Sequence, residues 1–359
     1  MTGSRMKIVH CLFALGTGGA EVLAVELLNE MSKTQDVSLV IINDKYNPAL
    51  IAQLNPVIKI HYLHRKEGSA NPWPLIKLNM LLMKLRPDVI HCHEPKTGKA
   101  IRVRHAKLIY TIHDVGISTS TYHSYDGLVA ISDAVYEEVH ASFPNVRKIY
   151  NGVPIHQFKT RAHHNLETGK PFRMVQVSRL MHEKKGQDIL LRAMSVLRQR
   201  GMVNFSLHLV GSGPSEKYLR DLTRELDLEE QVTFLGDKTR QWIFENLAGY
   251  DALIQPSRYE GFGLTIIEAF AAGIPVVASD IDGPAEILAQ TSAGFLFRDG
   301  KSESCAEAVL QVVNSYQSNE IGALVEETLH VIKEKYSVET CSREYLLEYN
   351  RLKSVYATK

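Results

Sequence analysis

Cysteine and tryptophan are scarce in this chain of 359 residues, which contains four cysteines and two tryptophans. The cysteines are far apart and form no CxxC pair, which excludes a disulfide framework and predicts buried thiols in a reducing compartment. They are Cys11, Cys92, Cys305 and Cys341. No run of about 18 residues is apolar without charge or proline, so no membrane-spanning helix is predicted. The first residues lack the order of a signal peptide, and we therefore expect a cytoplasmic protein.

An excess of charge of one sign is also missing, since 41 Lys and Arg balance 40 Asp and Glu. The formal net charge of +1 excludes bulk attraction to nucleic acid, and we expect no nucleic-acid partner. The balance is uneven along the chain, because residues 61–110 hold ten Lys and Arg against three Asp and Glu. This stretch predicts one positively charged surface.

Apolar β-rich segments alternate with helical patterns along the chain, which predicts an α/β fold with two doubly wound parallel-sheet domains of Rossmann type. The predicted strands are 7–13, 36–43, 57–63, 88–93, 107–113, 126–132, 172–178, 205–211, 231–236, 251–257 and 274–279. The predicted helices are 21–33, 75–85, 133–143, 186–200, 215–226, 240–250, 264–273 and about 338–355.

A linker rich in Gly, Pro and His interrupts this alternation at residues 151–170. We expect one domain over 1–165, with the last helical stretch (about 338–359) packing back on it, and a second over 166–337. Ligands of open parallel sheets bind at the carboxyl ends of the strands. Two such sheets would face each other across a cleft.

The sharpest motif is PSRYEGFGLTIIEAFAAGIPVVAS at residues 256–279. Glu260 lies in the loop after a predicted strand, Gly261-Phe262-Gly263 opens a helix, and Glu268 lies within that helix. Glycines let a ligand approach the backbone, and the N–H groups at a helix start bind phosphate. Glu268 has two acceptor oxygens with which it could hold a ribose diol. A solvent-facing Glu268 and a first-turn Glu260 are the structural alternative.

Cations follow the first strand of the second half, in VSRLMHEKKGQDILL at residues 177–191. Arg179 at the strand end and Lys184 and Lys185 before Gly186 suit a diphosphate, although a solvated basic turn has the same composition.

Two further motifs follow strands of the first half. LGTGGAE at residues 15–21 permits close backbone approach, but Glu21 replaces the third glycine of the dinucleotide fingerprint, so NAD binding is disfavoured. TIHD places His113 and Asp114 after a strand, where an imidazole can bond a sugar hydroxyl or transfer a proton.

Three other patterns are interpreted as decoys. Asp280-Ile281-Asp282 has a metal-binding DxD form, but two carboxylates in a loop are weak support for a metal site. His91-Cys92-His93 has no further clustered ligand in the sequence that would complete a metal site. The segment from Gly294 to Lys301-Ser302 has one residue too many for a Walker A loop. We therefore expect no bound metal and no cofactor.

Taken in order, these motifs resemble the retaining GT-B-fold enzymes of glycosyltransferase family 4. The resemblance covers nearly the whole chain. Its motifs are GGAE at 18–21, DVIHCH at 88–93, TIHD at 111–114, AISDAV at 130–135, NGV at 151–153, SRLMHEKKG at 178–186, LVGSGP at 209–214, VTFLG at 232–236, the EGFGLTIIE block and GPAEI at 283–287.

The resemblance implies a role for each matching residue, with catalysis by Glu260, His113, Arg179 and Lys185. Glu260 would contact the transferred sugar, Glu268 the nucleotide ribose, and His113 the sugar near C6. Arg179 with Lys185, or with Lys184, would neutralise the donor diphosphate. The remaining donor-binding positions are Gly18, Gly19, Gly211, Leu235, Gly261, Phe262, Gly263 and Leu264, of which 262–264 would offer backbone N–H groups to the β-phosphate.

The implied reaction moves a hexosyl unit from a UDP- or GDP-linked sugar to a glycan or lipid-linked glycan, with retention and without metal, in surface polysaccharide or lipopolysaccharide synthesis. The alternatives are a nucleotide-sugar epimerase of the same fold and a non-catalytic nucleotide-sugar-binding module. The basic, apolar segment 75–87 predicts either peripheral contact with the inner membrane, on its cytoplasmic face, or an ordinary core-packing helix.

Overall fold

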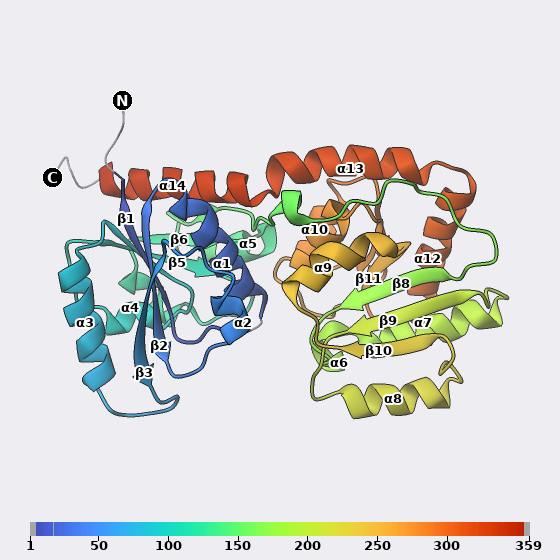
Figure 1. Cartoon of the computed structure of the whole chain (residues 1–359), viewed down its shortest axis with the longest axis horizontal. Coiled ribbons are helices and arrows are strands. Elements are labelled where there is room, and N and C mark those ends of the chain that lie inside the picture. The colour runs from blue at the N-terminus through green and yellow to red at the C-terminus, as the bar shows by residue number, and fades with distance from the viewer. Residues whose placement is uncertain (1–4, 17, 355–359) are drawn as a thin grey trace. The chain divides into compact units, whose positions relative to one another are not determined.

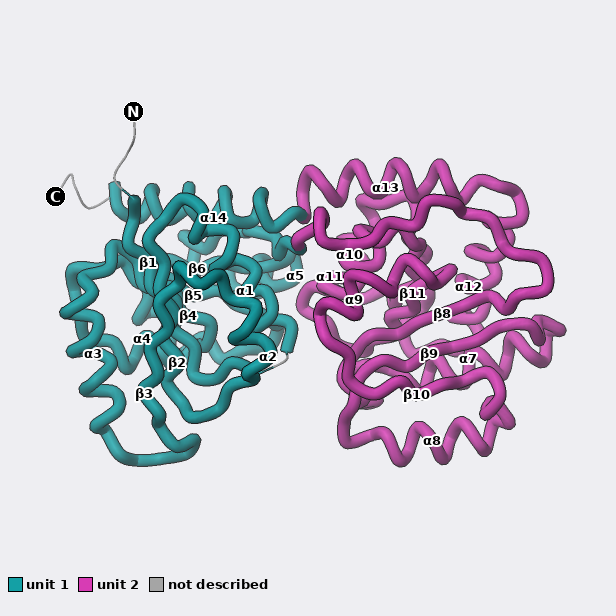
Figure 2. The backbone as a smooth tube through the Cα atoms, in the orientation of Figure 1, with its two compact units in different colours: residues 1–153, 337–359 teal, residues 154–336 magenta. Residues whose placement is uncertain are grey.

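The computed structural model describes residues 5–16 and 18–354 and divides the chain into two compact units (Figures 1 and 2). Unit 1 comprises residues 1–153 and 337–359, and unit 2 comprises 154–336. The boundary therefore lies before the predicted 165. Residues after Val153 bond to unit 2, since Lys159 N–H donates to Phe244 O (2.8 Å) and Arg161 N–H to Ala272 O (2.9 Å).

Unit 1 contains a seven-stranded parallel sheet in the order β3-β2-β1-β4-β5-β6-β7. Its strands are β1 (Lys7–Leu12), β2 (Asp36–Asn43), β3 (Lys59–Arg65), β4 (Val89–Cys92), β5 (Lys107–Ile112), β6 (Gly127–Ala130) and β7 (Arg147–Lys148). Its helices are α1 (Gly19–Ser32), α2 (Pro48–Ile51), α3 (Trp73–Leu85), α4 (Thr97–Ala100), α5 (Asp133–His140) and α14 (Val338–Ser354), with a 3₁₀ turn at Thr119–Ser124.

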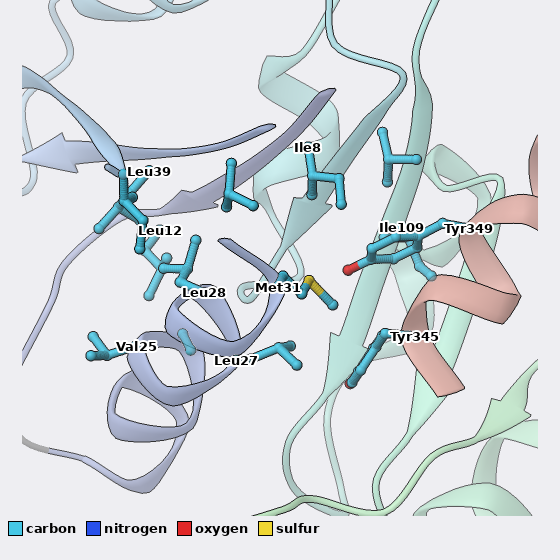
Figure 3. Packing of buried hydrophobic residues seen from close by; sticks show 14 of the residues in the cluster. Ile8, Leu12, Val25, Leu27, Leu28, Met31, Leu39, Ile109, Tyr345 and Tyr349 are labelled. Carbon is cyan, nitrogen blue, oxygen red and sulfur yellow. The ribbon is translucent and has the colours of Figure 1, made fainter. Parts of the chain in front are cut away.

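The core of unit 1 lies between the sheet and two helices that are distant in sequence. Leu28 and Met31 of α1 pack with Ile8 and with Tyr345 and Tyr349 of α14 (Figure 3). The helix α14 also covers β6, where a Cβ added to the close-packed glycine 127 would lie 2.7 Å from a side-chain carbon of residue 352. The last helix is thus part of unit 1, in agreement with its expected packing on the first domain.

Unit 2 contains a six-stranded parallel sheet in the order β10-β9-β8-β11-β12-β13. Its strands are β8 (Phe172–Val177), β9 (Phe205–Val210), β10 (Val232–Gly236), β11 (Ala252–Gln255), β12 (Val276–Ser279) and β13 (Gly294–Phe297). Its helices are α6 (His182–Lys185), α7 (Gln187–Gln199), α8 (Glu216–Glu225), α9 (Arg240–Asn246), α10 (Leu264–Ala271), α11 (Asp282–Leu288), α12 (Ser302–Gln317) and α13 (Ile321–Lys335), with 3₁₀ turns at Ile155–Gln157 and Leu247–Gly249.

The two-domain α/β prediction is confirmed, whereas several element predictions are wrong in detail. Strand β3 begins and ends two residues later than predicted, and α3 begins at Trp73, whose N–H is capped by Asn71 Oδ1 at 3.0 Å. Strand β13 and helices α11 to α13 were not predicted from the sequence.

Candidate functional site

Both sheets have a switch point, where the strand order reverses, and a crevice forms beside such a point at the carboxyl ends of the strands. In unit 2 the switch point lies between β8 and β11, and in unit 1 it lies between β1 and β4. Each predicted donor-binding residue of unit 2 lies at the carboxyl end of β8, β9, β10 or β11 or in the segment that follows that strand. The parallel strands therefore bring them to one edge of the sheet.

An ion pair spans the switch point of unit 2. Lys185 Nζ, from the short helix after β8, donates to Glu260 Oε2, from the loop after β11, at 2.5 Å. Both side chains are only 18% exposed. Gln255 Nε2 at the end of β11 donates to the same carboxylate oxygen at 3.2 Å. The structure thus selects Lys185, rather than Lys184, as the cation beside Glu260.

Arg258 holds the loops after β8 and β11 together. Its guanidinium forms a bidentate pair with Asp188, with both N···O distances 2.8 Å, and also donates to His182 O at 2.7 Å. Its backbone N–H donates to Lys184 O at 2.9 Å. Lys184 therefore contributes backbone geometry to the junction, and bidentate pairing gives the loops a defined relative position.

Gly186 ends the lysine-bearing turn at a point where no side chain fits. Its φ is +64°, and an added Cβ would lie 1.8 Å from Pro256 O. Arg179 lies just before this turn with its side chain exposed. Within residues 5–16 and 18–354 it takes part in no ion pair. It can therefore accept an anion without first breaking one.

The helix α10 begins at Leu264, directly after Gly263 in a left-handed conformation (φ +106°). Gly261 and Phe262 are buried. A Cβ on Gly283, at the start of α11, would lie 2.4 Å from Phe262 Cα, so the GPAEI motif keeps this loop in place. The first N–H groups of an eight-residue helix thus face the end of the sheet from a rigid loop.

Glu268 is buried in α10 and forms an ion pair with Arg240 at the start of α9. The carboxylate is only 6% exposed and the guanidinium 13%. This position excludes the alternative of a solvent-facing Glu268. Sequence reasoning missed Arg240, which lies 28 residues away and has no recognisable motif around it.

Gly211 directly follows β9, and Leu235 lies near the end of β10. Gly211 forms a single bridge with Gly236, in which Gly211 N–H donates to Gly236 O at 2.9 Å. Gly211 has a φ of +128°, and an added Cβ would lie 2.0 Å from Ser178 O. The backbones at the ends of β8, β9 and β10 therefore lie close together.

At the switch point of unit 1, Gly18 and Gly19 form the start of α1. A Cβ on Gly18 would lie 2.5 Å from Glu21 Oε2. The loop before them is held by Glu94, whose Oε1 accepts Phe13 N–H at 2.8 Å. Burial raises the pKa of Glu94 to about 8, although the Phe13 N–H opposes this shift. Thr17 of the LGTGGAE motif lies outside the described residues.

Four histidines gather behind this edge, on β1 and β4 and directly after β4 and β5. His10 Nδ1 lies 3.0 Å from His93 Nε2, and His93 Nδ1 lies 3.3 Å from His113 Nε2. His91 pairs instead with Tyr349 Oη and Thr111 Oγ1, both at 2.7 Å. Burial lowers the pKa of His10 to about 3 and that of His113 to about 4, and those of His91 and His93 also lie well below 6.5.

The expectation that nothing completes the His91 and His93 pair is wrong, because β1 lies beside β4 and places His10 opposite His91. Ligand atoms of His10, His91 and His93 lie within 4.8 Å of one another. Hydrogen bonds to hydroxyl groups occupy both nitrogens of His91, so the group fits a hydrogen-bonded network better than a metal site. Asp280 and Asp282 are exposed and belong to no three-residue cluster in the described part of the chain.

Comparison with known proteins decides the family. Residues 17–157 match the model described as Glycosyltransferase Family 4, and residues 157–323 match Glycosyl transferases group 1. The chain belongs to the glycosyltransferases of this type. The predicted GT-B architecture is confirmed by solved glycosyltransferase structures.

Three relatives illustrate the similarity. This glycosyltransferase is 26% identical to an uncharacterized glycosyltransferase of Methanocaldococcus jannaschii over 347 residues, covering 85% of each chain. It is 25% identical to the lipopolysaccharide 1,6-galactosyltransferase of Salmonella typhimurium, covering 81% of this chain and 84% of that one. Its fold matches Anabaena HepE, solved with UDP and glucose, with a TM-score of 0.79, 21% identity, and coverage of 96% and 100%.

No helix within the described residues is both long and apolar enough to cross a membrane.

Proposed function

We propose that this glycosyltransferase moves a hexosyl unit from a nucleoside diphosphate sugar to a hydroxyl of a glycan or lipid-linked glycan, with retention at the anomeric carbon and without a metal ion. The observation that carries the proposal is the Lys185–Glu260 pair across the switch point of unit 2, beside the start of α10. Cation, carboxylate and helix N-terminus there combine an anion site with a group that can contact a sugar.

Charge on the leaving diphosphate is the main quantity that such a site must stabilise. Arg179 and Lys185 would pair with the phosphate oxygens, and the N–H groups of residues 262–264 would bind the β-phosphate. Donors that are fixed before the reaction stabilise developing charge without reorganisation, and removing one such donor from an oxyanion hole costs about 3 kcal/mol. These groups make a metal ion unnecessary in the proposed mechanism.

Glu268 would bind the ribose hydroxyls through its carboxylate, which its ion pair with Arg240 holds in place. Gly211 and Leu235, at the ends of β9 and β10, would lie against the base. Glu260 would contact the transferred sugar, and His113 of unit 1 would bond a hydroxyl near C6.

UDP is the preferred nucleotide of this proposal, because HepE was solved with UDP. Thermal unfolding in the presence of UDP and GDP sugars tests it, since a ligand that binds the native state raises the melting temperature. The best donor is then incubated with glycan acceptors, and NMR of the product reports the anomeric configuration. An inverted product would overturn retention.

Two controls separate the alternatives. A donor epimer formed without acceptor would identify an epimerase, and stabilisation without any product would support a binding module. Excess EDTA should leave transfer unchanged, and loss of activity that Mg²⁺ or Mn²⁺ restores would bring Asp280 and Asp282 back as ligands.

The acceptor partner of this proposal is attached to an anionic lipid surface, and α3 of unit 1 is the docking element. Four apolar side chains on one face of α3 are exposed, Trp73 by 54%, Ile76 by 44%, Met80 by 55% and Met83 by 56%. Residues three, four and seven apart share a helix face, so these side chains form one stripe.

Basic side chains border this stripe. Lys77 and Lys84 are exposed on the same helix. Asn79 bonds to Ala100 O and Arg102 N–H at 2.9 and 2.6 Å, which places exposed Arg102 beside α3. A second copy of the chain docking symmetrically would bring these cations together, whereas anionic headgroups would neutralise them.

Vesicle flotation tests the docking with the full chain and phosphatidylglycerol vesicles. Each lysine contributes roughly 1 kcal/mol near an anionic surface, so Lys77→Gln with Lys84→Gln should weaken binding roughly thirtyfold. Met80→Ser with Met83→Ser should also weaken it, while exposed Val203→Ser with Leu347→Ser should not. The docking proposal would be overturned if all variants bound equally or if the protein bound phosphatidylcholine vesicles equally well. It would also be overturned if the protein formed dimers that Met80→Ser dissociates.

A further inference from the structure

His93 lies between His10 and His113 and uses both of its ring nitrogens in hydrogen bonds to them. The three rings come from β1, the end of β4 and the end of β5, which are adjacent strands of one sheet. His10 is fully buried, and His93 is 6% exposed. No role follows for this chain of rings from the proposed transfer reaction alone.

The hydrogen bonds restrict where the protons can be. Burial lowers the pKa of all three imidazoles, so each is neutral near pH 7 and carries one N–H and one lone pair. His93 must therefore donate to one neighbour and accept from the other. Only two arrangements of protons satisfy both contacts.

The two arrangements differ in what they leave unpaired on His10. Nε2 of His10 is buried and has no hydrogen-bond partner among the described residues. If His10 donates to His93, this Nε2 is a bare lone pair, and if His10 accepts, it is a buried N–H. Buried N–H groups without a partner are the rarer and more costly of the two. The geometry therefore favours donation from His10 Nδ1 to His93 Nε2 and from His93 Nδ1 to His113 Nε2.

We infer that His93 is a positioning residue that, together with His10, holds His113 as the tautomer protonated on Nδ1. His113 Nε2 then accepts from His93, and Nδ1–H is the hydrogen-bond donor that the ring presents to a ligand. Within the described residues no group bonds to Nδ1 of His113. The use of this donor by a sugar hydroxyl rests on the proposed function, whereas the tautomer itself does not.

The tautomer is measured directly by long-range ¹H–¹⁵N NMR of the full chain labelled in histidine, at a pH near 7.5. The His113 signals are assigned by their loss in His113→Gln. The expected spectrum shows His113 protonated on Nδ1. A proton on Nε2 overturns the inference, whatever the enzyme transfers.

Variants of His93 test the positioning role. His93→Phe keeps a ring but removes both nitrogens, and it should give His113 a mixture of tautomers. His93→Gln can still donate and accept, and it should restore most of the wild-type pattern. If His93→Phe folds and the His113 spectrum is unchanged, the positioning role of His93 is overturned. If His93→Phe does not fold, a mixture of His113 tautomers in His93→Gln overturns that role.

Kinetics separate positioning from a purely structural effect. Loss of one oriented hydrogen bond should raise KM for the donor sugar by roughly fivefold with little change in kcat. His91→Gln is the matched control, because His91 stacks on His93 at 4.4 Å but bonds to other partners. Equal effects of both substitutions on KM would overturn positioning. Absence of transfer with the expected tautomer would overturn the proposed function and leave this inference standing.

Discussion

Replacing Glu260 by glutamine should strengthen the binding of UDP while it abolishes sugar transfer. In the structure Lys185 donates to Glu260 at 2.5 Å, so a diphosphate has to compete with this carboxylate for the ammonium group. The glutamine variant removes the competitor and keeps a side chain of the same size. It also removes the carboxylate that would contact the transferred sugar.

The size of the effect follows from burial. Exposed ion pairs contribute at most about 1 kcal/mol, and breaking a fully buried pair costs about 3 to 5 kcal/mol. Lys185 and Glu260 are each 18% exposed, so their pair falls between these limits, at about 2 kcal/mol. In the wild type, UDP binding must spend most of this free energy to move Lys185 from Glu260 to the phosphate. Glu260→Gln removes that cost, so the Kd of UDP should fall about tenfold.

Isothermal titration of UDP at fixed ionic strength measures the change. Lys185→Gln should act in the opposite direction and weaken the binding of UDP. In the double variant, the increase in UDP affinity caused by Glu260→Gln should disappear. Glu183→Gln is the matched control, since Glu183 lies on the same short helix with a side chain 69% exposed. Unchanged or weaker UDP binding by Glu260→Gln would refute the assignment of Lys185 to the diphosphate.

Three further predictions concern stability, and all are measured by urea unfolding. Gly186→Ala should lower the free energy of unfolding by at least about 3 kcal/mol, because its positive φ strains alanine and the new Cβ clashes with the backbone. Gly169→Ala, at φ +80° in open space, should lower it by about 1 to 2 kcal/mol, and equal losses would contradict this reasoning. Arg240→Met should lose about 3 kcal/mol by leaving Glu268 buried without its cation, and a neutral result would contradict the pairing. Burial lowers the pKa of His113 to about 4, so as the pH falls this imidazole is protonated in the unfolded chain before it is protonated in the folded one. The free energy of unfolding should therefore fall by roughly 3 kcal/mol between pH 6.5 and 4, and the fall should be smaller in His113→Gln.

Residues that belong to contiguous motifs could be found from sequence, because local order alone brings them together. Glu260, Gly263 and Glu268 lie on one strand-loop-helix segment, and their spacing already places them at the carboxyl edge of a parallel sheet. Residues that act through partners from other segments could not be found in this way. Arg240 and His10 stand in stretches without any motif, and their partners are 28 and 83 residues away.

The unit boundary shows the same limit. Composition placed the linker at 151–170, but hydrogen bonds of Lys159 and Arg161 assign most of that stretch to unit 2. A linker is defined by the contacts that it does not make, and composition does not report contacts.

The sequence by itself determined the alternation of strands and helices, the parallel sheets and the strand ends at which chemistry is concentrated, because hydrophobic periodicity and glycine placement act over a few residues. The tertiary structure decided which lysine lies against Glu260, which cation accompanies Glu268 and that four histidines share one buried cluster. Those pairings depend on strand order and register, which bring together segments that are far apart in the chain. The positive segment 61–110 is a further case, since only folding showed that α3 within it exposes an apolar stripe.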